Sequence, residues 1–213
     1  MPTIFLPSCK LKAKYPAQSL RLREYLAARA NAETVGCCKQ YLARATEDIS
    51  AIVVCNNCAA IMEESSPVRD IQYAWSIIDA DPAFPFPDYG GERMTVQDCW
   101  KAYDRRNVQN VVRSLLRKMN IQAVEQAENF DRTRFCGTTL LDTPFEIGIR
   151  YAPKRYANAP YQSLSPEEQS EALRAHCASI ATNRVVCYCP TCMAGIERGG
   201  KGAVHLIELL FPL

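Results

Sequence analysis

Hydrophobic positions along the chain alternate between short β-branched runs and longer stretches with helical spacing. The runs at 3–6, 50–54, 94–96, 121–124 and 184–187 predict buried strands. Val108, Val112, Leu115 and Met119 form the clearest helical stripe, with polar residues on the opposite side. Strand and helix alternate in both halves, so the sequence predicts an α/β fold of two similar parallel units.

Three further stretches predict single elements. Apolar residues at 68, 71, 74, 75 and 78 have helical spacing and predict a helix that closes the first half. Residues 145–151 alternate in polarity and predict a strand, with a loop after it. Ser165 and Glu168 form a capping-box pattern with Pro166 at the first helical position, which predicts a helix from there to about residue 181.

Proline and glycine mark the expected division of the chain. Residues 81–93 contain three prolines and two glycines, a density that ends helices and interrupts strands. We expect a first unit at 1–80, a linker at 81–93 and a second unit at 94–213. Residues 138–162 have no counterpart in the first half, so they are expected to be an insertion in the second unit.

Charge and hydropathy exclude several functional classes. The formal net charge is only +2 and no basic stripe is present, so nucleic acid is not an expected partner. No apolar run approaches the roughly 20 residues of a membrane span, so no direct membrane insertion is expected. Residues 1–6 lack the pattern of a signal peptide, which favours a cytoplasmic location.

Cysteine is the unusual part of the composition. The chain has eleven cysteines, an odd number, and two Cys-x-x-Cys pairs, which indicates a metal or redox site and not a disulfide scaffold. Cys9, Cys55, Cys99 and Cys189 lie at or just after the ends of predicted strands. Because functional residues of parallel sheets collect at the carboxyl ends of strands, each half is expected to gather its thiols at one sheet edge.

The order of the cysteines is similar in the two halves. The first half has Cys9, then the pair Cys37-Cys38, then Cys55-x-x-Cys58. The second half has Cys99, then a single Cys136 before a glycine, then Cys189-x-x-Cys192. This order resembles the cysteine-rich CCG domain, usually present twice, of the CCG-domain subunit of heterodisulfide reductase and its relatives. The stretches 7–16 and 204–210 are also similar to that family.

The resemblance implies an iron–sulfur subunit of a redox complex, an oxidoreductase subunit that reduces a disulfide or relays electrons. It implies one or two clusters per chain, [4Fe-4S] in type, with Cys37 and Cys38 at the reactive site. A ferredoxin-type iron–sulfur subunit or another electron donor would be the partner, and a disulfide the candidate substrate. The implied ligands are Cys9, Cys37, Cys38, Cys55 and Cys58 in the first set, and Cys99, Cys136, Cys189 and Cys192 in the second.

Alternatives remain open at the level of sequence. Zinc also takes four thiolates in a tetrahedral site, so a zinc- or thiol-stabilised binding module is the main rival. A degenerate relative that has lost its clusters is another, because the second half has only one cysteine at Cys136. Cys187 is a candidate fifth ligand of the second set, although alternation along the strand points it to the opposite face from Val186 and Tyr188. Cys177 is expected to be a buried hydrophobic residue, His176 a helix-edge residue and His205 a structural one.

Overall fold

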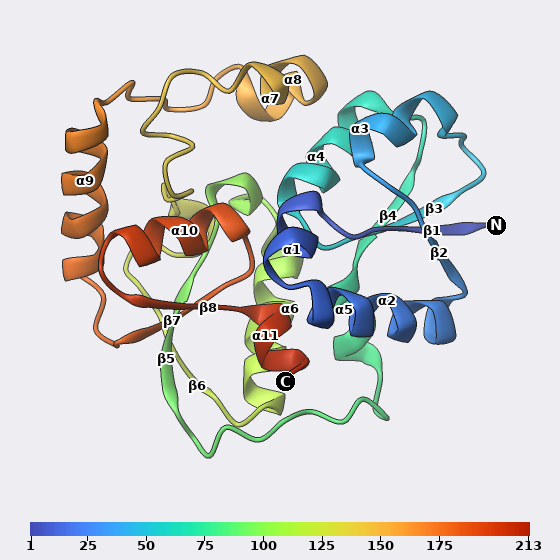
Figure 1. Cartoon of the computed structure of the whole chain (residues 1–213), viewed down its shortest axis with the longest axis horizontal. Coiled ribbons are helices and arrows are strands. Elements are labelled where there is room, and N and C mark those ends of the chain that lie inside the picture. Colours follow the sequence, from blue (N-terminus) through green and yellow to red (C-terminus); the bar gives the residue numbers. More distant parts are fainter. The chain divides into compact units, whose positions relative to one another are not determined.

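The computed structural model describes all 213 residues, which form two compact units (Figure 1). The first unit comprises residues 1–80, 146–158 and 211–213, and the second comprises 81–145 and 159–210. Each unit contains a four-stranded sheet in which every pairing is parallel. The expected fold of two similar parallel α/β units is therefore confirmed.

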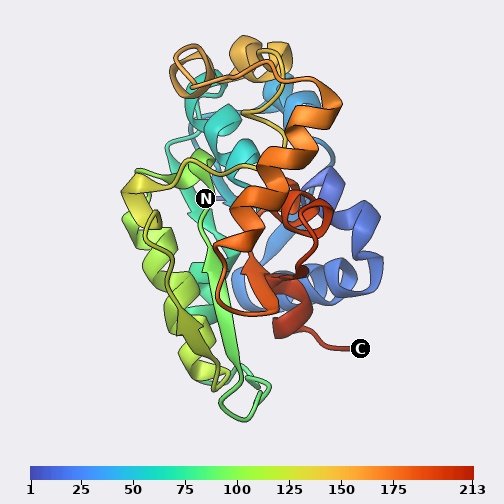
Figure 2. The same cartoon turned by 90° about the vertical axis from the view of Figure 1, so that its left-hand side faces the viewer.

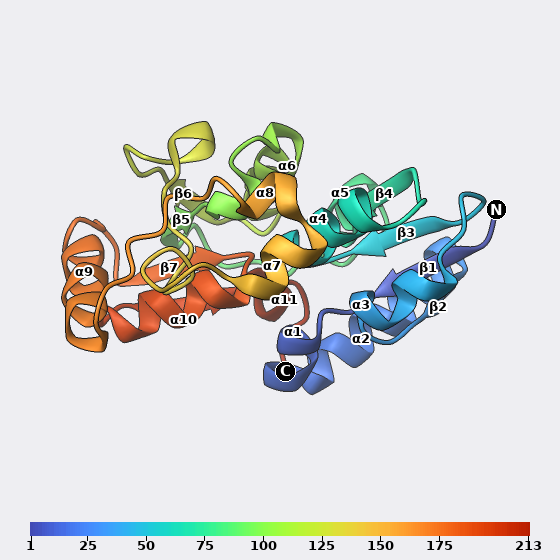
Figure 3. The same ribbon diagram turned by 90° about the horizontal axis from the view of Figure 1, so that it is seen from above.

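The first unit has the strand order β2-β1-β3-β4. The connection from β1 leads outward to the edge strand β2, and the connection from β3 leads outward to the opposite edge strand β4. Because both connections are right-handed, α2 and α4 lie on opposite faces of the sheet (Figure 3). The elements are β1 (Thr3–Leu6), α1 (Cys9–Lys14), α2 (Pro16–Ala30), β2 (Ala32–Thr34), α3 (Cys38–Tyr41), η1 (Leu42–Arg44), β3 (Ser50–Val53), α4 (Asn56–Ser65), β4 (Asp70–Tyr73) and α5 (Ala74–Ala80).

The second unit repeats this topology with the order β6-β5-β7-β8. Here α6 and α10 cover opposite faces of the sheet (Figure 2). The elements are β5 (Arg93–Gln97), η2 (Trp100–Ala102), α6 (Arg106–Lys118), β6 (Gln122–Val124), η3 (Phe130–Arg132), α9 (Pro166–Ala178), β7 (Arg184–Cys187), α10 (Pro190–Arg198), β8 (Gly202–His205) and α11 (Leu206–Leu210).

Each unit has its own apolar core between sheet and helices. Ile52 of β3 and Trp75 of α5 are completely buried in the first unit, and Val186 of β7 and Leu116 of α6 are completely buried in the second. The stripe predicted for α6 is the buried side of that helix, as the spacing indicated. No helix of the structure combines the length and the apolar run that a bilayer span requires.

Two sequence-based element predictions are wrong. Residues 70–73, predicted as part of a helix, form the edge strand β4, which pairs with β3 before the helix begins at Ala74. Residues 145–151, predicted as a strand, form α7 (Glu146–Tyr151), and α8 (Pro153–Tyr156) follows where a loop was expected. Both helices contact α4. Tertiary packing therefore overrides the short local patterns in both places.

The segment 81–93 is packed into the second unit. The backbone N–H of Tyr89 donates to Met119 at 2.9 Å, and that of Gly91 donates to Asn120 at 2.8 Å. The Tyr89 hydroxyl also donates to the carbonyl of Leu209 at 3.0 Å. Part of the expected insertion, residues 146–158, belongs to the first unit instead of the second. The boundaries of the units thus differ from those expected at both places.

Candidate metal and thiol sites

Strand topology determines where the cysteines lie. In each sheet the connections leave the two central strands in opposite directions, which opens a crevice outside their carboxyl ends. Cys9 is the first residue of α1, after β1. Cys99, Cys55 and Cys189 are the N-caps of η2, α4 and α10, which follow β5, β3 and β7. Both crevices therefore receive a thiol from each central strand, as the sequence led us to expect.

The second-unit cysteine cluster consists of four thiols in contact. All four sulfur atoms lie within 4.8 Å of one another, and the Sγ atoms of Cys99 and Cys136 are 3.7 Å apart. None of the four residues is more than 3% exposed, and no disulfide joins them. Four thiols at this spacing could hold a metal ion. The members are Cys99, Cys136, Cys189 and Cys192.

The thiols of this cluster differ in acidity. Burial raises the pKa of Cys99 and of Cys192 well above the ordinary value. A hydrogen bond from Cys136, supported by the nearby Lys101 ammonium, holds the pKa of Cys189 well below it. Because four thiolates this close repel one another, all four can be deprotonated together only around a cation. The arrangement is therefore suited to a bound metal ion.

Gly137 allows the loop of Cys136 to reach the other three thiols. Its φ is +54°, a left-handed conformation that favours glycine. A Cβ atom there would lie 2.1 Å from the carbonyl oxygen of Thr191, inside the turn between Cys189 and Cys192. The two cysteine-bearing loops can approach this closely only because residue 137 has no side chain.

A buried ionic network supports the loops that carry Cys99 and Cys189. The Asp98 carboxylate accepts two hydrogen bonds from Arg113, at 2.7 and 2.8 Å, and one from the Tyr188 hydroxyl at 2.9 Å. Arg113 also binds Glu125 at 2.7 Å. Burial would raise the pKa of the Glu125 carboxyl, but Arg113 and a hydrogen bond from Asn129 together lower it. Asp98 and Tyr188 each precede a cluster cysteine, so their hydrogen bond fixes the two loops against each other.

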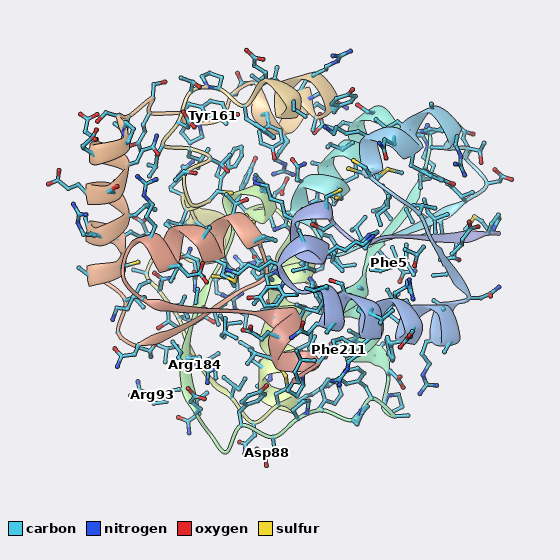
Figure 4. The ribbon with its side chains drawn as sticks, viewed as in Figure 1. Phe5, Asp88, Arg93, Tyr161, Arg184 and Phe211 are labelled. Carbon is cyan, nitrogen blue, oxygen red and sulfur yellow. The ribbon has the colours of Figure 1, made fainter.

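The first-unit cysteine chain has five thiols and is more open. Cys9 is exposed, whereas Cys38 and Cys58 are each 7% exposed. Hydrogen bonds link the thiols in the order Cys9, Cys37, Cys38, Cys58 and Cys55. Figure 4 shows yellow sulfur atoms beside the ribbons of α3 and α4. All five residues that the family resemblance implies as ligands are therefore brought to one edge of the first sheet.

The Cys38 thiol is more acidic than an ordinary cysteine. A hydrogen bond from Cys58 lowers the pKa of Cys38 to about 7, although burial opposes the shift. The same contact raises the pKa of Cys58 well above its ordinary value. Cys38 is therefore partly a thiolate at neutral pH, which is the nucleophilic and metal-binding form.

Two tyrosines hold the turn between Cys55 and Cys58. The hydroxyl of Tyr73 donates to Oδ1 of Asn56 at 3.0 Å, and the hydroxyl of Tyr156 donates to Oδ1 of Asn57. Tyr156 lies in α8, in the segment that the sequence assigned to the other unit. The same segment binds α4 again, because Glu64 accepts hydrogen bonds from the backbone at 154 and 155. The segment 146–158 is thus part of the support of the first site.

We expect Tyr156→Phe to loosen this turn without unfolding the unit. Loss of one partly buried hydrogen bond costs about 1 kcal/mol, so amides of residues 55–60 should exchange roughly fivefold faster. Hydrogen exchange measured by mass spectrometry checks this. Tyr151→Phe is the matched control, because no hydrogen bond involves the Tyr151 hydroxyl. Equal exchange in the two variants would contradict the role given to Tyr156.

The remaining cysteines and histidines lie outside the two sets. Cys187 is buried at the end of β7 and is not one of the four clustered thiols. Cys177 is buried, as expected, with its thiol 3.5 Å from the carbonyl of Ile196. His205 is buried and its Nδ1 accepts from the backbone at 207. His176 is half-buried against Phe135, with Nε2 2.7 Å from Gln97 Oε1.

Comparisons with known proteins do not place this chain in a family. A scan against protein-family models finds no match, and a search of curated proteins finds none either. The chemistry of the two cysteine sets therefore rests on their own geometry. That geometry is a closed, buried set of four thiols in the second unit and an accessible set of five in the first.

Proposed function

We propose that this chain is a metal-binding subunit of a redox complex, resembling the CCG-domain subunit of heterodisulfide reductase, with one thiolate site in each unit. The observation that carries the proposal is the buried cluster of four thiols in the second unit, all within 4.8 Å. Buried thiols at this density are a metal-binding arrangement, since metal ions neutralise the thiolates and contribute folding free energy. Both sites occupy equivalent positions in equivalent sheets.

The spacing in the second unit favours a single tetrahedral ion, with zinc as the first choice. Zn–S bonds of about 2.3 Å at tetrahedral angles place sulfur ligands about 3.8 Å apart. The Sγ atoms of Cys99 and Cys136 are 3.7 Å apart, and none of the six separations exceeds 4.8 Å. A four-iron cluster would hold its cysteine sulfurs farther apart, because the inorganic core lies between them. This closed site would hold loops together, as structural zinc sites do.

Two features of the first unit favour an iron–sulfur cluster there. It offers five thiols, one more than a tetrahedral ion takes, in the order that the family resemblance implies. Asn56 is 1% exposed and its Nδ2 has no hydrogen-bond partner, although its Oδ1 is engaged by Tyr73. A buried N–H donor beside Cys55 suits the sulfur atoms of a cluster, which accept such bonds.

The open side of the first site favours a reactive role. Cys9 and Cys37 are accessible, whereas the four thiols of the second unit are sealed from solvent. A cluster bound here would supply one-electron chemistry, and the family resemblance implies Cys37 and Cys38 as the reactive thiols. A disulfide is the proposed substrate, and a ferredoxin-type subunit or another carrier would deliver the electrons. The second site would then be structural.

A pair of matched variants tests this division. Cys58 and Cys192 are both the third residue of the helix that follows the third strand of their sheet, α4 and α10. In protein purified without oxygen, Cys58→Ser should lose iron and sulfide and keep zinc. Cys192→Ser should lose zinc and keep iron and sulfide. Metal and sulfide analysis with visible absorbance measures both, and Cys177→Ser, outside both sets, is the control.

Two outcomes would contradict the proposal. A colourless protein with zinc alone would favour a binding module with no redox role. Iron that depends on Cys192 and not on Cys58 would reverse the assignment, leaving the first-unit thiols without metal. If the division holds, Cys38→Ser should abolish disulfide reduction while zinc in the second unit stays bound.

A further inference from the structure

Lys101 is a buried cation beside the second-unit cysteine cluster. Its side chain belongs to a residue that is only 5% exposed, although lysine almost always keeps its ammonium group in water. Removing a charge from water is costly unless an opposite charge lies close to it. The burial of Lys101 therefore indicates that negative charge lies nearby in the functional protein.

Two hydrogen bonds place Lys101 along the turn that carries Cys136. The lysine lies in η2, and the backbone N–H of its neighbour Trp100 donates to the carbonyl of Phe135 at 2.9 Å. Nζ of Lys101 donates to Oγ1 of Thr139 at 3.4 Å, and the backbone N–H of Thr139 donates to the carbonyl of Cys136 at 3.1 Å. The lysine side chain therefore follows this turn from one end to the other.

The other buried cation of this region is already balanced by carboxylates. Arg113 pairs with Asp98 at 2.7 Å and with Glu125 at 2.7 Å. The hydrogen bond of Lys101 goes instead to a hydroxyl, which accepts the bond without neutralising the ammonium. The hydrogen bonds from the other three thiols contribute most to the low pKa of Cys189, and the charge of Lys101 lowers that pKa further. Lys101 is thus a cation that acts on the cluster.

A divalent ion cannot balance four thiolates alone. The ion and its ligands together keep an excess of negative charge, which a buried site holds most stably when a cation lies beside it. We propose that the Lys101 ammonium balances this excess charge and is required for the second unit to hold its metal tightly. The proposal rests on the proposed zinc site and adds to it a residue outside the four ligands. Lys101 is a positioning residue, because it acts on the metal through the thiolates.

Lys101→Met tests the proposal, since methionine keeps an unbranched side chain and removes the charge. In the full chain handled without oxygen, competition with a chelator should show that zinc binds roughly 10- to 100-fold more weakly than in the wild type, the usual cost of losing an outer-shell partner. Zinc should also pass to the chelator faster. Thr139→Val removes the hydrogen bond and keeps the charge, so it should weaken zinc binding less than Lys101→Met does.

Unfolding of the zinc-free protein separates charge balance from ordinary packing. A lysine that only fills space would stabilise the second unit equally with and without metal. Without metal, four adjacent thiolates repel one another and cannot all form, so the buried ammonium has less negative charge beside it. Zinc-free Lys101→Met should therefore resist urea at least as well as the zinc-free wild type. Equal destabilisation with and without zinc would overturn the inference.

Lys201→Met is the matched control. Lys201 is partly buried in the same unit, and its Nζ donates to the carbonyl of Ile180 at 3.1 Å, outside the cluster. This variant should bind zinc as tightly as the wild type. If Lys101→Met also did so, the role of Lys101 would be refuted and the zinc site would stand. Absence of zinc from the wild-type protein would overturn the site itself, and the role of Lys101 with it.

Discussion

Gly137→Ala should remove the metal of the second unit and destabilise that unit by about 3 kcal/mol or more. The added Cβ would lie 2.1 Å from the carbonyl oxygen of Thr191, and 3.3 Å from its side chain. A backbone oxygen cannot move aside without displacing the turn between Cys189 and Cys192. Cys136 would then no longer lie within bonding distance of an ion shared with the other thiols.

A second glycine separates the clash from the cost of the left-handed backbone. Gly90 has φ +60°, close to that of Gly137, but a Cβ atom there would meet nothing within 4 Å. Gly90→Ala should therefore cost only about 1 kcal/mol and leave the metal bound. Metal content per chain and thermal unfolding of the two variants measure the difference. Full metal content in Gly137→Ala would show that the close contact with Thr191 is not required.

Asp98→Asn should lower the free energy of unfolding of the second unit by about 3 kcal/mol. Asp98 is completely buried, and its carboxylate is the shared acceptor for Arg113, Tyr188 and the backbone N–H of Phe130. An amide removes the charge that balances the 7% exposed Arg113 side chain. It also replaces an acceptor oxygen with a donor that faces other donors. Retention of metal should fall as well, because the loops of Cys99 and Cys189 lose their connection.

Asp131→Asn is the control for this substitution. Asp131 pairs with Arg106 at 2.8 Å in the same unit, but both side chains are more than half exposed. Exposed ion pairs contribute less than about 1 kcal/mol, so this variant should unfold nearly like the wild type. Urea unfolding followed by hydrogen exchange of β5 and α6 reports on the second unit alone. Equal stabilities of the two variants would refute the role of the buried network.

The sequence predicted the sites well where the signal was local. The valines before Cys55 and Cys187 mark strands, and the cysteines after those strands lie at the sheet edge, as parallel topology requires. Gly137 was visible as the glycine after Cys136, but its necessity depends on Thr191, 54 positions later. Residues 145–151 alternate over too short a length to distinguish strand from helix, and their contact with α4 decides the outcome.

Residues that support the sites from a distance could not be found in this way. Tyr156 binds Asn57 across 99 positions, and no pattern near either residue indicates the pairing. Lys101 is buried, and its charge adds to the hydrogen bond from Cys136 that lowers the pKa of Cys189. Each role depends on packing between segments distant in sequence.

The alternation of the two units along the chain affects the order in which the protein can be completed during synthesis. The first unit needs residues 146–158, which the ribosome makes only after 81–145 of the second unit. The thiols at Cys55 and Cys58 therefore emerge long before the tyrosine that steadies their turn. Cutting one peptide bond cannot yield two complete units, because segments of the two units alternate along the chain. A single cut within the chain therefore leaves at least one unit in two pieces.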